Sequence, residues 1–259
     1  MGQDTLITVL LALIHGVTEI LPVSYQGHLL VFEKLLATEN PLAVEIALHA
    51  GTLAAIIAFY FKPLRRLFRR HNRRLLLMVL AGTIPVAIVG AFFKLADLDE
   101  KISTLPISGA GFLVTGIFIL YCLRTHEEAK EMAQMSWTDV LAIALMQGAS
   151  ELPGISRSGM TISMALKLDI MGGDAAAFSF LLAIPAMAGA EFVRCISAVK
   201  HGYFTGDLML PMFIGFLISA IVGYCALYVL ANTLNKERFK YYAYYCLLLG
   251  AGVIAWRLI

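Results

Sequence analysis

Six long apolar runs constrain the fold of this chain more than any other feature of its sequence. They cover residues 42–61, 75–94, 106–123, 175–199, 209–234 and 241–258. A helix needs about 20 apolar residues to cross the roughly 30 Å of hydrocarbon in a bilayer. Only 15% of the 259 residues are charged, whereas soluble domains carry about a quarter. The sequence therefore predicts an all-α integral membrane protein with six transmembrane helices.

Two further segments, residues 5–36 and 138–170, are apolar but interrupted. Each holds a short apolar stretch, a break rich in Pro, Gly and Ser, and then a second short stretch. A helix that breaks within the membrane is tolerated only where its freed backbone groups are buried in protein or line a wet cavity. We therefore expect both segments to form re-entrant helical hairpins.

The two interrupted segments also match each other without a gap. LIHGVTEILPVSYQG (13–27) and LMQGASELPGISRSG (145–159) share residues at five positions, all Leu, Gly, Glu or Ser. This predicts a duplication within a single membrane domain (1–259), with repeat 1 over 1–131 and repeat 2 over 132–259. Each repeat has one hairpin and three spans, and because three is odd, the second copy must be inverted. The hairpins would then enter from opposite faces and meet near the midplane.

A cluster of basic residues gives the expected orientation. The segment 62–74 contains seven Lys and Arg and no acid: Lys62, Arg65, Arg66, Arg69, Arg70, Arg73 and Arg74. Such a cluster is typical either of a patch for nucleic acid or anionic lipid, or of a cytoplasmic loop that follows the positive-inside rule. We favour the second interpretation, which makes both termini external. The net charge of +2 indicates no nucleic-acid partner.

The second hairpin contains the sharper chemical signal, PGISRSGMT (153–161). Arg157 is flanked by Ser156, Ser158 and Thr161, and its guanidinium group matches the oxygens of a phosphate. Hydroxyls and the amides at the start of the following helix would add further donors for an anion. The alternative is a structural role, in which Arg157 is capped by carbonyls and paired with Glu151 or Glu19.

The first hairpin contains groups that would complement such a phosphate site. Glu19 is a candidate metal ligand or base, and His28 is a candidate for proton transfer near neutral pH. Ser24 or Tyr25 would either attack phosphorus or only donate hydrogen bonds. Glu45 and His49, four residues apart, would face the same cavity or form a structural pair.

Two other groups of residues are expected to be structural. The four cysteines are far apart and show no CxxC spacing, which indicates neither a disulfide framework nor a zinc site. Glu191 and Arg194 are expected to form a pair near the end of a helix.

Three segments carry a resemblance to a known family: GVTEILPVSYQGH, PGISRSGMT and FSFLLAIPAMAGA (178–190). They resemble the signature segments of bacterial undecaprenyl-diphosphate phosphatases, the bacitracin-resistance protein family. The resemblance implies a multi-pass enzyme of the bacterial plasma membrane whose active site opens to the external side. Its substrate would be a polyprenyl diphosphate lipid, recycled as a carrier for peptidoglycan synthesis. It also implies a divalent cation, Mg²⁺ or Ca²⁺.

The first motif departs from the family pattern at two positions. The family has Glu/Gln-x-x-x-Glu, and here Glu19 supplies the second acid whereas His15 occupies the first position. The family has two serines before Thr-Gly-His, and here Ser24 is followed by Tyr25, with His28 in register. The serine that Tyr25 replaces is the one usually proposed as nucleophile or phosphate ligand. Three routes remain open: attack by Ser24, by Tyr25 or by a metal-bound water.

The second motif matches the family more closely. Arg157 corresponds to the phosphate-binding arginine of the family, with Ser156, Ser158 and Thr161 in register. Gln147 corresponds to a family glutamine, and Glu151 is an acid where members commonly carry an apolar residue; it would join Glu19 at a metal.

The alternative function is that of a lipid-phosphate transporter of the same fold that does not hydrolyse its ligand. Whether the chain forms a homodimer is left open.

Overall fold

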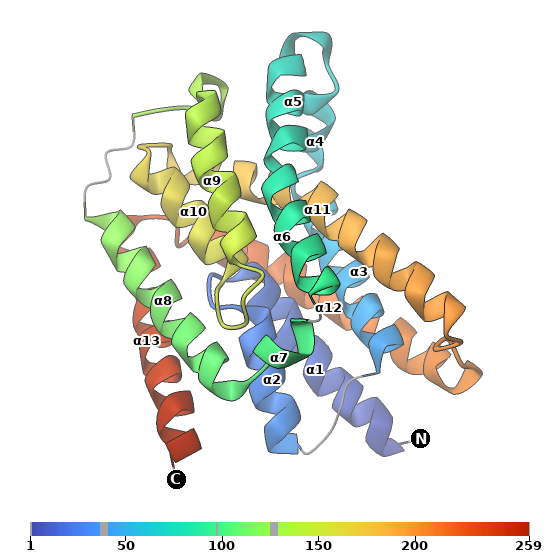
Figure 1. Cartoon of the computed structure of the whole chain (residues 1–259). Coiled ribbons are helices and arrows are strands. Elements are labelled where there is room, and N and C mark those ends of the chain that lie inside the picture. Colours follow the sequence, from blue (N-terminus) through green and yellow to red (C-terminus); the bar gives the residue numbers. More distant parts are fainter. Residues whose placement is uncertain (1, 37–40, 97, 125–128, 259) are drawn as a thin grey trace.

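The computed structural model describes residues 2–36, 41–96, 98–124 and 129–258 (Figure 1), and within these ranges it is helical, with no β-strand. The helices in chain order are α1 (Gly2–Ile20), α2 (Tyr25–Leu36), α3 (Leu42–Phe59), α4 (Phe61–Leu67), η1 (Arg70–Asn72), α5 (Arg73–Gly82), α6 (Ile84–Leu95), α7 (Asp99–Ile102), α8 (Leu105–Leu123), η2 (Met132–Gln134), α9 (Trp137–Ala149), α10 (Arg157–Lys167), α11 (Gly172–Lys200), η3 (Gly206–Leu208), α12 (Met209–Ala231) and α13 (Lys236–Leu258). The all-α class predicted from the sequence is confirmed.

Among the described residues, five helical segments are long and apolar enough to cross a membrane: α3, η1 to α6, α8, α11 and η3 to α12. The second of these is interrupted at Thr83, because Pro85 lies in the first turn of α6 and cannot donate to the preceding turn. The sixth predicted span, 241–258, is helical as part of α13 but is not among the five. Four tyrosines in its first half lower its hydropathy.

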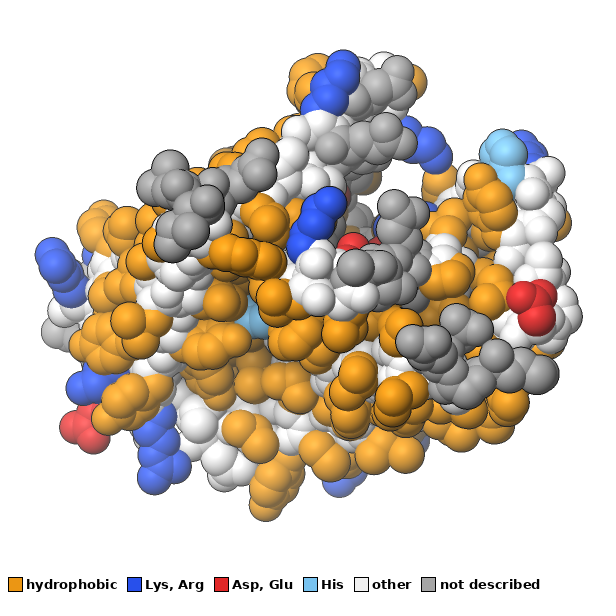
Figure 2. Space-filling model, turned by 90° about the horizontal axis from the view of Figure 1, so that it is seen from below, with side chains coloured by type: hydrophobic (Ala, Val, Ile, Leu, Met, Phe, Trp, Pro, Cys, Tyr) orange, Lys and Arg blue, Asp and Glu red, His pale blue; other side chains and the backbone are white. Residues whose placement is uncertain are grey.

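The outer surface of the helices is apolar. Ile88, Phe92, Ile117, Ile221 and Leu248 are more than half exposed, and Figure 2 shows hydrophobic side chains over most of one end of the molecule. Contiguous apolar surface of this extent marks contact with a membrane or another protein. Together with the five apolar helices, it indicates a multi-pass membrane protein.

The two interrupted segments are both helix pairs joined by a short turn. Figure 1 shows α1–α2 and α9–α10 approaching each other from opposite ends, with their turns at the centre of the molecule. The Ser158 hydroxyl donates a hydrogen bond to the Leu21 carbonyl at 3.1 Å. A Cβ placed on Gly27 would lie 3.0 Å from Cα of Gly154. Only glycine at residue 27 lets the two turns come so close.

Helices from the two halves of the chain pack against each other reciprocally. In the first hairpin α1 packs on α12, and in the second α9 packs on α5 and α6; α3 packs on α12, and α8 on α13. The main apolar core joins both halves and includes Ile20, Met78, Ile143 and Phe180. The boundary between repeats at residues 131 and 132 stays a prediction, and this reciprocal packing is an observation in its favour.

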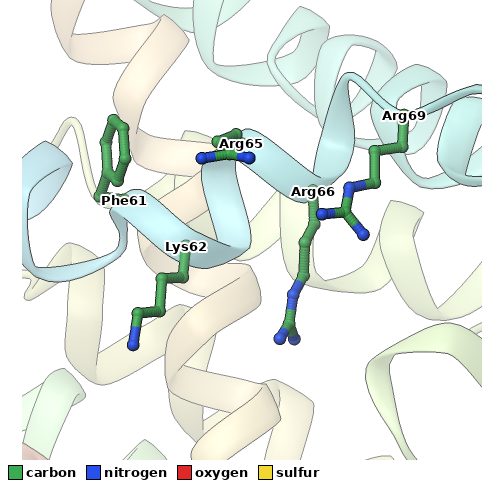
Figure 3. A pocket seen from close by; sticks show the side chains of 5 residues that line it. All are labelled: Phe61, Lys62, Arg65, Arg66 and Arg69. Atoms are coloured by element: carbon green, nitrogen blue, oxygen red, sulfur yellow. The ribbon is translucent and has the colours of Figure 1, made fainter.

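The basic segment lies at the end of the molecule opposite the chain termini (Figure 1). There the side chains of α4 and the turn after it line a depression of about 210 Å³. Figure 3 shows its lining residues: Phe61, Lys62, Arg65, Arg66 and Arg69. This charge asymmetry between the two ends is the one that the positive-inside rule describes.

Candidate active site

The two hairpins are joined by an ion pair between Arg157 and Glu19. Glu19 is in the last turn of α1, and Arg157 is the first residue of α10. Arg157 Nη2 lies 2.7 Å from Glu19 Oε1, and the two side chains are only 14% and 3% exposed. The guanidinium also lies 5.5 Å from the centre of the Phe180 ring. The structure therefore brings together the two charged residues that the sequence placed in opposite hairpins.

A small cavity of about 20 Å³ lies beside this ion pair. Both turns contribute to its wall, and the lining residues are Thr18, Glu19, Ser24, Tyr25, Gln26, Ser150, Ile155, Ser156 and Arg157. A volume of this size holds about one water molecule. A phosphate group therefore enters only if the side chains on the two hairpins move apart. The sequence assigned no role to Thr18, Gln26 or Ser150, although each lies next to a residue that it singled out.

Several polar atoms at this cavity are buried and have no hydrogen-bond partner among the described residues. They are Glu19 Oε2, Arg157 Nη1, Ser24 Oγ and Gln26 Oε1. A buried polar atom without a partner costs about 1–3 kcal/mol, so several at one place require an explanation. Ser24 also has a left-handed backbone with φ of 68°, and such strain in a residue other than glycine clusters at functional sites. These features indicate a binding site for a polar ligand.

The predicted phosphate ligands on α10 divide into two groups. Ser156 lines the cavity and caps the helix, because its hydroxyl accepts a hydrogen bond from the Gly159 amide at 3.1 Å. Ser158 and Thr161 are not in the cavity wall. Ser158 donates to Leu21, and Thr161 donates to the Arg157 carbonyl at 2.8 Å. These two hydroxyls support Arg157 and the contact between hairpins, and their predicted role as phosphate ligands stays a prediction.

His28 lies in α2, one turn after Ser24, and is not among the residues that line the cavity. Its Nδ1 lies 2.7 Å from the Ser24 carbonyl, and its Nε2 lies 2.7 Å from the Tyr245 hydroxyl. Both ring nitrogens are therefore occupied within the protein. The geometry supports a role in holding the strained backbone of Ser24, and proton transfer by His28 stays a prediction.

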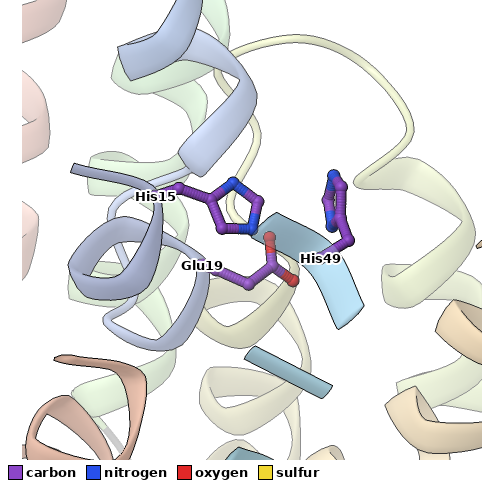
Figure 4. A group of neighbouring side chains, drawn as sticks. All are labelled: His15, Glu19 and His49. Carbon is purple, nitrogen blue, oxygen red and sulfur yellow. The ribbon is translucent and has the colours of Figure 1, made fainter. Parts of the chain in front are cut away.

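Two histidines lie on the other side of Glu19. His15 is one turn before Glu19 on α1, and His49 is on α3 (Figure 4). The potential ligand atoms of these three buried residues lie within 4.8 Å of one another. The Tyr25 ring packs edge-on against both imidazoles, at 5.2 Å from His15 and 4.8 Å from His49. The two departures from the family pattern, His15 and Tyr25, are thus in contact.

The predicted metal pair of Glu19 and Glu151 stays a prediction. Within the described part of the chain, the group that could hold a metal is His15, Glu19 and His49. Glu151 follows the end of α9 and belongs to no such group; its carboxylate lies near Gly90 of α6. Gln147 is buried, and its side-chain amide has no hydrogen-bond partner among the described residues.

The remaining charged residues form a network that the sequence predicted only in part. Glu45 and His49 form the expected pair on one helix face, with Oε1 and Nε2 3.8 Å apart. Arg194 lies 3.5 Å from Glu191, as expected, but it approaches Glu45 more closely, at 2.9 Å. The pair near the end of α11 is therefore part of a link to α3.

Comparison with known proteins identifies the family of the chain. Residues 8–252 match the family described as bacitracin resistance protein BacA. The chain belongs to this family. An undecaprenyl-diphosphatase of Carboxydothermus hydrogenoformans is 34% identical over 95% of this chain and 94% of its own. One of Desulfatibacillum aliphaticivorans is 35% identical over 95% and 96%. Undecaprenyl-diphosphatase 4 of Bacillus cereus is 35% identical over 95% and 93%.

Proposed function

We propose that this BacA family member hydrolyses undecaprenyl diphosphate to undecaprenyl phosphate and inorganic phosphate. The observation that carries the proposal is the Arg157–Glu19 pair beside a cavity with unpartnered polar atoms from both hairpins. The names of the relatives favour hydrolysis over the transport alternative. The reaction returns a lipid carrier to cell-wall synthesis, and the family description implies resistance to bacitracin.

Substrate binding begins with Arg157. Its Nη2 is held by Glu19, whereas its Nη1 is buried with no hydrogen-bond partner among the described residues and is available to a phosphate oxygen. Arg157 also begins α10, and the first amides of a helix point outward and favour an anion. A terminal phosphate that approaches the cavity therefore meets a guanidinium and a helix N-terminus together. Glu19 fixes the direction of the guanidinium and keeps it from pairing elsewhere.

The reaction replaces the bond between the bridging oxygen and the terminal phosphorus with a bond from water. Such transfers pass through a loose transition state, so positioning and neutralisation of charge contribute most. The Ser24 hydroxyl is unpartnered and lines the cavity, and in this proposal it orients the attacking water. Arg157 neutralises the charge that develops on the phosphate oxygens. The proton of the water ends on the released phosphate, and undecaprenyl phosphate is the leaving group.

A divalent cation remains part of the proposal. When bound, it supplies further neutralisation of phosphate charge. Glu19 is the residue that would hold it, because its Oε2 is buried and has no described partner. Mg²⁺ and Ca²⁺ favour sites built of oxygen atoms, whereas the neighbours of Glu19 in the cluster are two imidazoles. The donors fit these two ions poorly.

The proposed orientation places the basic segment in the cytoplasm of a bacterial cell and both termini outside the plasma membrane. Figure 1 agrees with the relative positions, since the termini lie at one end and α4–α5 at the other. Cysteines introduced at Asn72 and Gly206, in a background without the four native cysteines, test this. A membrane-impermeant thiol reagent added to intact cells should label the cysteine at 206 and leave the one at 72 unlabelled. The reverse pattern contradicts the orientation.

Phosphate release from undecaprenyl diphosphate by the purified protein in detergent tests the function. Arg157→Ala should lower the rate by about 10³-fold, and Ser24→Ala by about 10²-fold, the two ends of the range seen when single charge-stabilising donors are removed. Ser163→Ala is the matched control, since its hydroxyl is also buried and unpartnered among the described residues but lies outside the cavity wall. It should leave the rate unchanged. A native protein that binds the lipid and releases no phosphate with any divalent cation would favour the transporter.

A further inference from the structure

We propose that His15, Glu19 and His49 form a binding site for a first-row transition metal ion, and that the preferred ion is Zn²⁺. The role of this ion in catalysis rests on the proposed function, because Glu19 also holds Arg157. The binding itself does not rest on it.

The three side chains come together from two helices. His15 and Glu19 are four residues apart on α1 and therefore share one face of that helix. His49 approaches from α3, and Figure 4 shows the Glu19 carboxylate beside the two imidazoles. Their ligand atoms lie within 4.8 Å of one another. Zinc bonds to nitrogen and oxygen are about 2.0–2.2 Å long, so one ion at the centre requires only small movements of these side chains.

The hydrogen bonding of the cluster is a second, independent observation. The three residues are 0%, 5% and 4% exposed, and within the described structure His15 Nδ1, Glu19 Oε2 and His49 Nε2 have no hydrogen-bond partner. His15 Nε2 reaches only the Thr52 hydroxyl, at 3.5 Å. Buried polar atoms without partners are costly, and a metal ion held by these three residues would offset part of that cost.

The donor set indicates which class of ion binds. Imidazole suits Zn²⁺ and its first-row neighbours, whereas Mg²⁺ and Ca²⁺ take oxygen ligands. Two histidines and one carboxylate, with a fourth position open, are a common set for a catalytic zinc ion. Arg157 orients Glu19, because it occupies Oε1 and leaves Oε2 for the metal.

The alternative is that the rings of His15, Tyr25 and His49 form only a packing cluster, with the two imidazole centres 4.4 Å apart. Metal binding by the purified full-length chain in detergent separates the two. After chelator treatment and removal of the chelator, Zn²⁺ is titrated by calorimetry, and Co²⁺ is added in parallel as a spectroscopic probe. We expect one Zn²⁺ per chain and the visible absorption bands of four-coordinate Co²⁺.

Substitutions of single histidines show which residues bind the metal. His49→Gln should weaken Zn²⁺ binding at least tenfold, whereas His71→Gln and His201→Gln are matched controls that remove exposed histidines and should change nothing. His15→Glu creates a two-carboxylate set and should weaken Zn²⁺ binding while strengthening that of Mg²⁺. Thermal melting shows whether His49→Gln folds. If it does not, the Co²⁺ spectrum of the native chain and the metal affinities of His15→Glu still distinguish a metal site from a packing cluster.

The outcomes for the site and for the function are separable, because binding is measured without substrate. No Zn²⁺ binding and no Co²⁺ bands in the native protein overturn the site, even if Mg²⁺ supports phosphate release. Equal losses of binding in His49→Gln and His201→Gln also overturn it. Zn²⁺ binding that depends on His49 supports the site, and a failure to release phosphate with Zn²⁺ bound would then count against the proposed function alone.

Discussion

Breaking the ion pair between the hairpins should cost far more stability than removing it altogether. Glu19→Leu leaves the guanidinium of Arg157 buried without its partner, and Arg157→Met leaves the carboxylate in the same state. Removal of one member of a buried pair costs about 3–5 kcal/mol, and the side chains here are 14% and 3% exposed. In a chain of this size 1 kcal/mol corresponds to roughly 2–4 °C in Tm. Each single variant should therefore melt about 6–20 °C below the native protein.

The double variant Glu19→Leu/Arg157→Met leaves no buried charge without a partner. It should melt near the native temperature, because replacing both members of a buried pair by apolar residues is often neutral. The coupling between the two substitutions, read from a double-mutant cycle of thermal melting in detergent, should equal the sum of the two single losses, about 6–10 kcal/mol. Phosphate release should be lost in all three variants. A double variant as unstable as the sum of the two single variants would refute the ion pair, and one that still releases phosphate would refute the catalytic role of Arg157.

Three further predictions concern residues around the cavity. Gly27→Ala should lower both Tm and phosphate release, since the added Cβ would lie 2.5 Å from the Phe112 ring; normal values for both would show that the turns can move apart. Tyr25→Ser restores the family pattern and should keep phosphate release at or above the native rate, so a rate loss of tenfold or more would make Tyr25 essential. His28→Gln should lower kcat for phosphate release without shifting its pH dependence, as expected for a positioning residue. A shifted pH dependence would support a role of His28 in proton transfer.

The sequence predicted the meeting of Glu19 and Arg157 because the duplication argument needs only topology. Two hairpins that enter from opposite faces must meet near the middle, whichever way their helices are rotated. The same argument could not give side-chain directions. Thr161 has the spacing of a phosphate ligand, but the rotation of α10 points its hydroxyl at Ser179, 2.6 Å away.

Contacts between distant helices were beyond prediction for a related reason. In a uniformly apolar helix no periodic pattern distinguishes the buried face from the lipid face. Tyr245, which is 217 residues from His28, was therefore indistinguishable from the other tyrosines of α13. His49 was paired with Glu45 because they share a helix, and its approach to His15 depends on how α3 packs against α1. No Cys/His spacing in the sequence predicted a zinc site, because the ligands come from two separate helices.

The short distance between Arg157 and Glu19 also affects how inorganic phosphate leaves the site after each turnover. The carboxylate neutralises part of the guanidinium charge from a tethered position 2.7 Å away, whereas the product is free to diffuse. A tethered counter-ion acts at a high effective concentration, so it weakens the attraction of Arg157 for the released anion. Inorganic phosphate should consequently be a weak product inhibitor of the native protein.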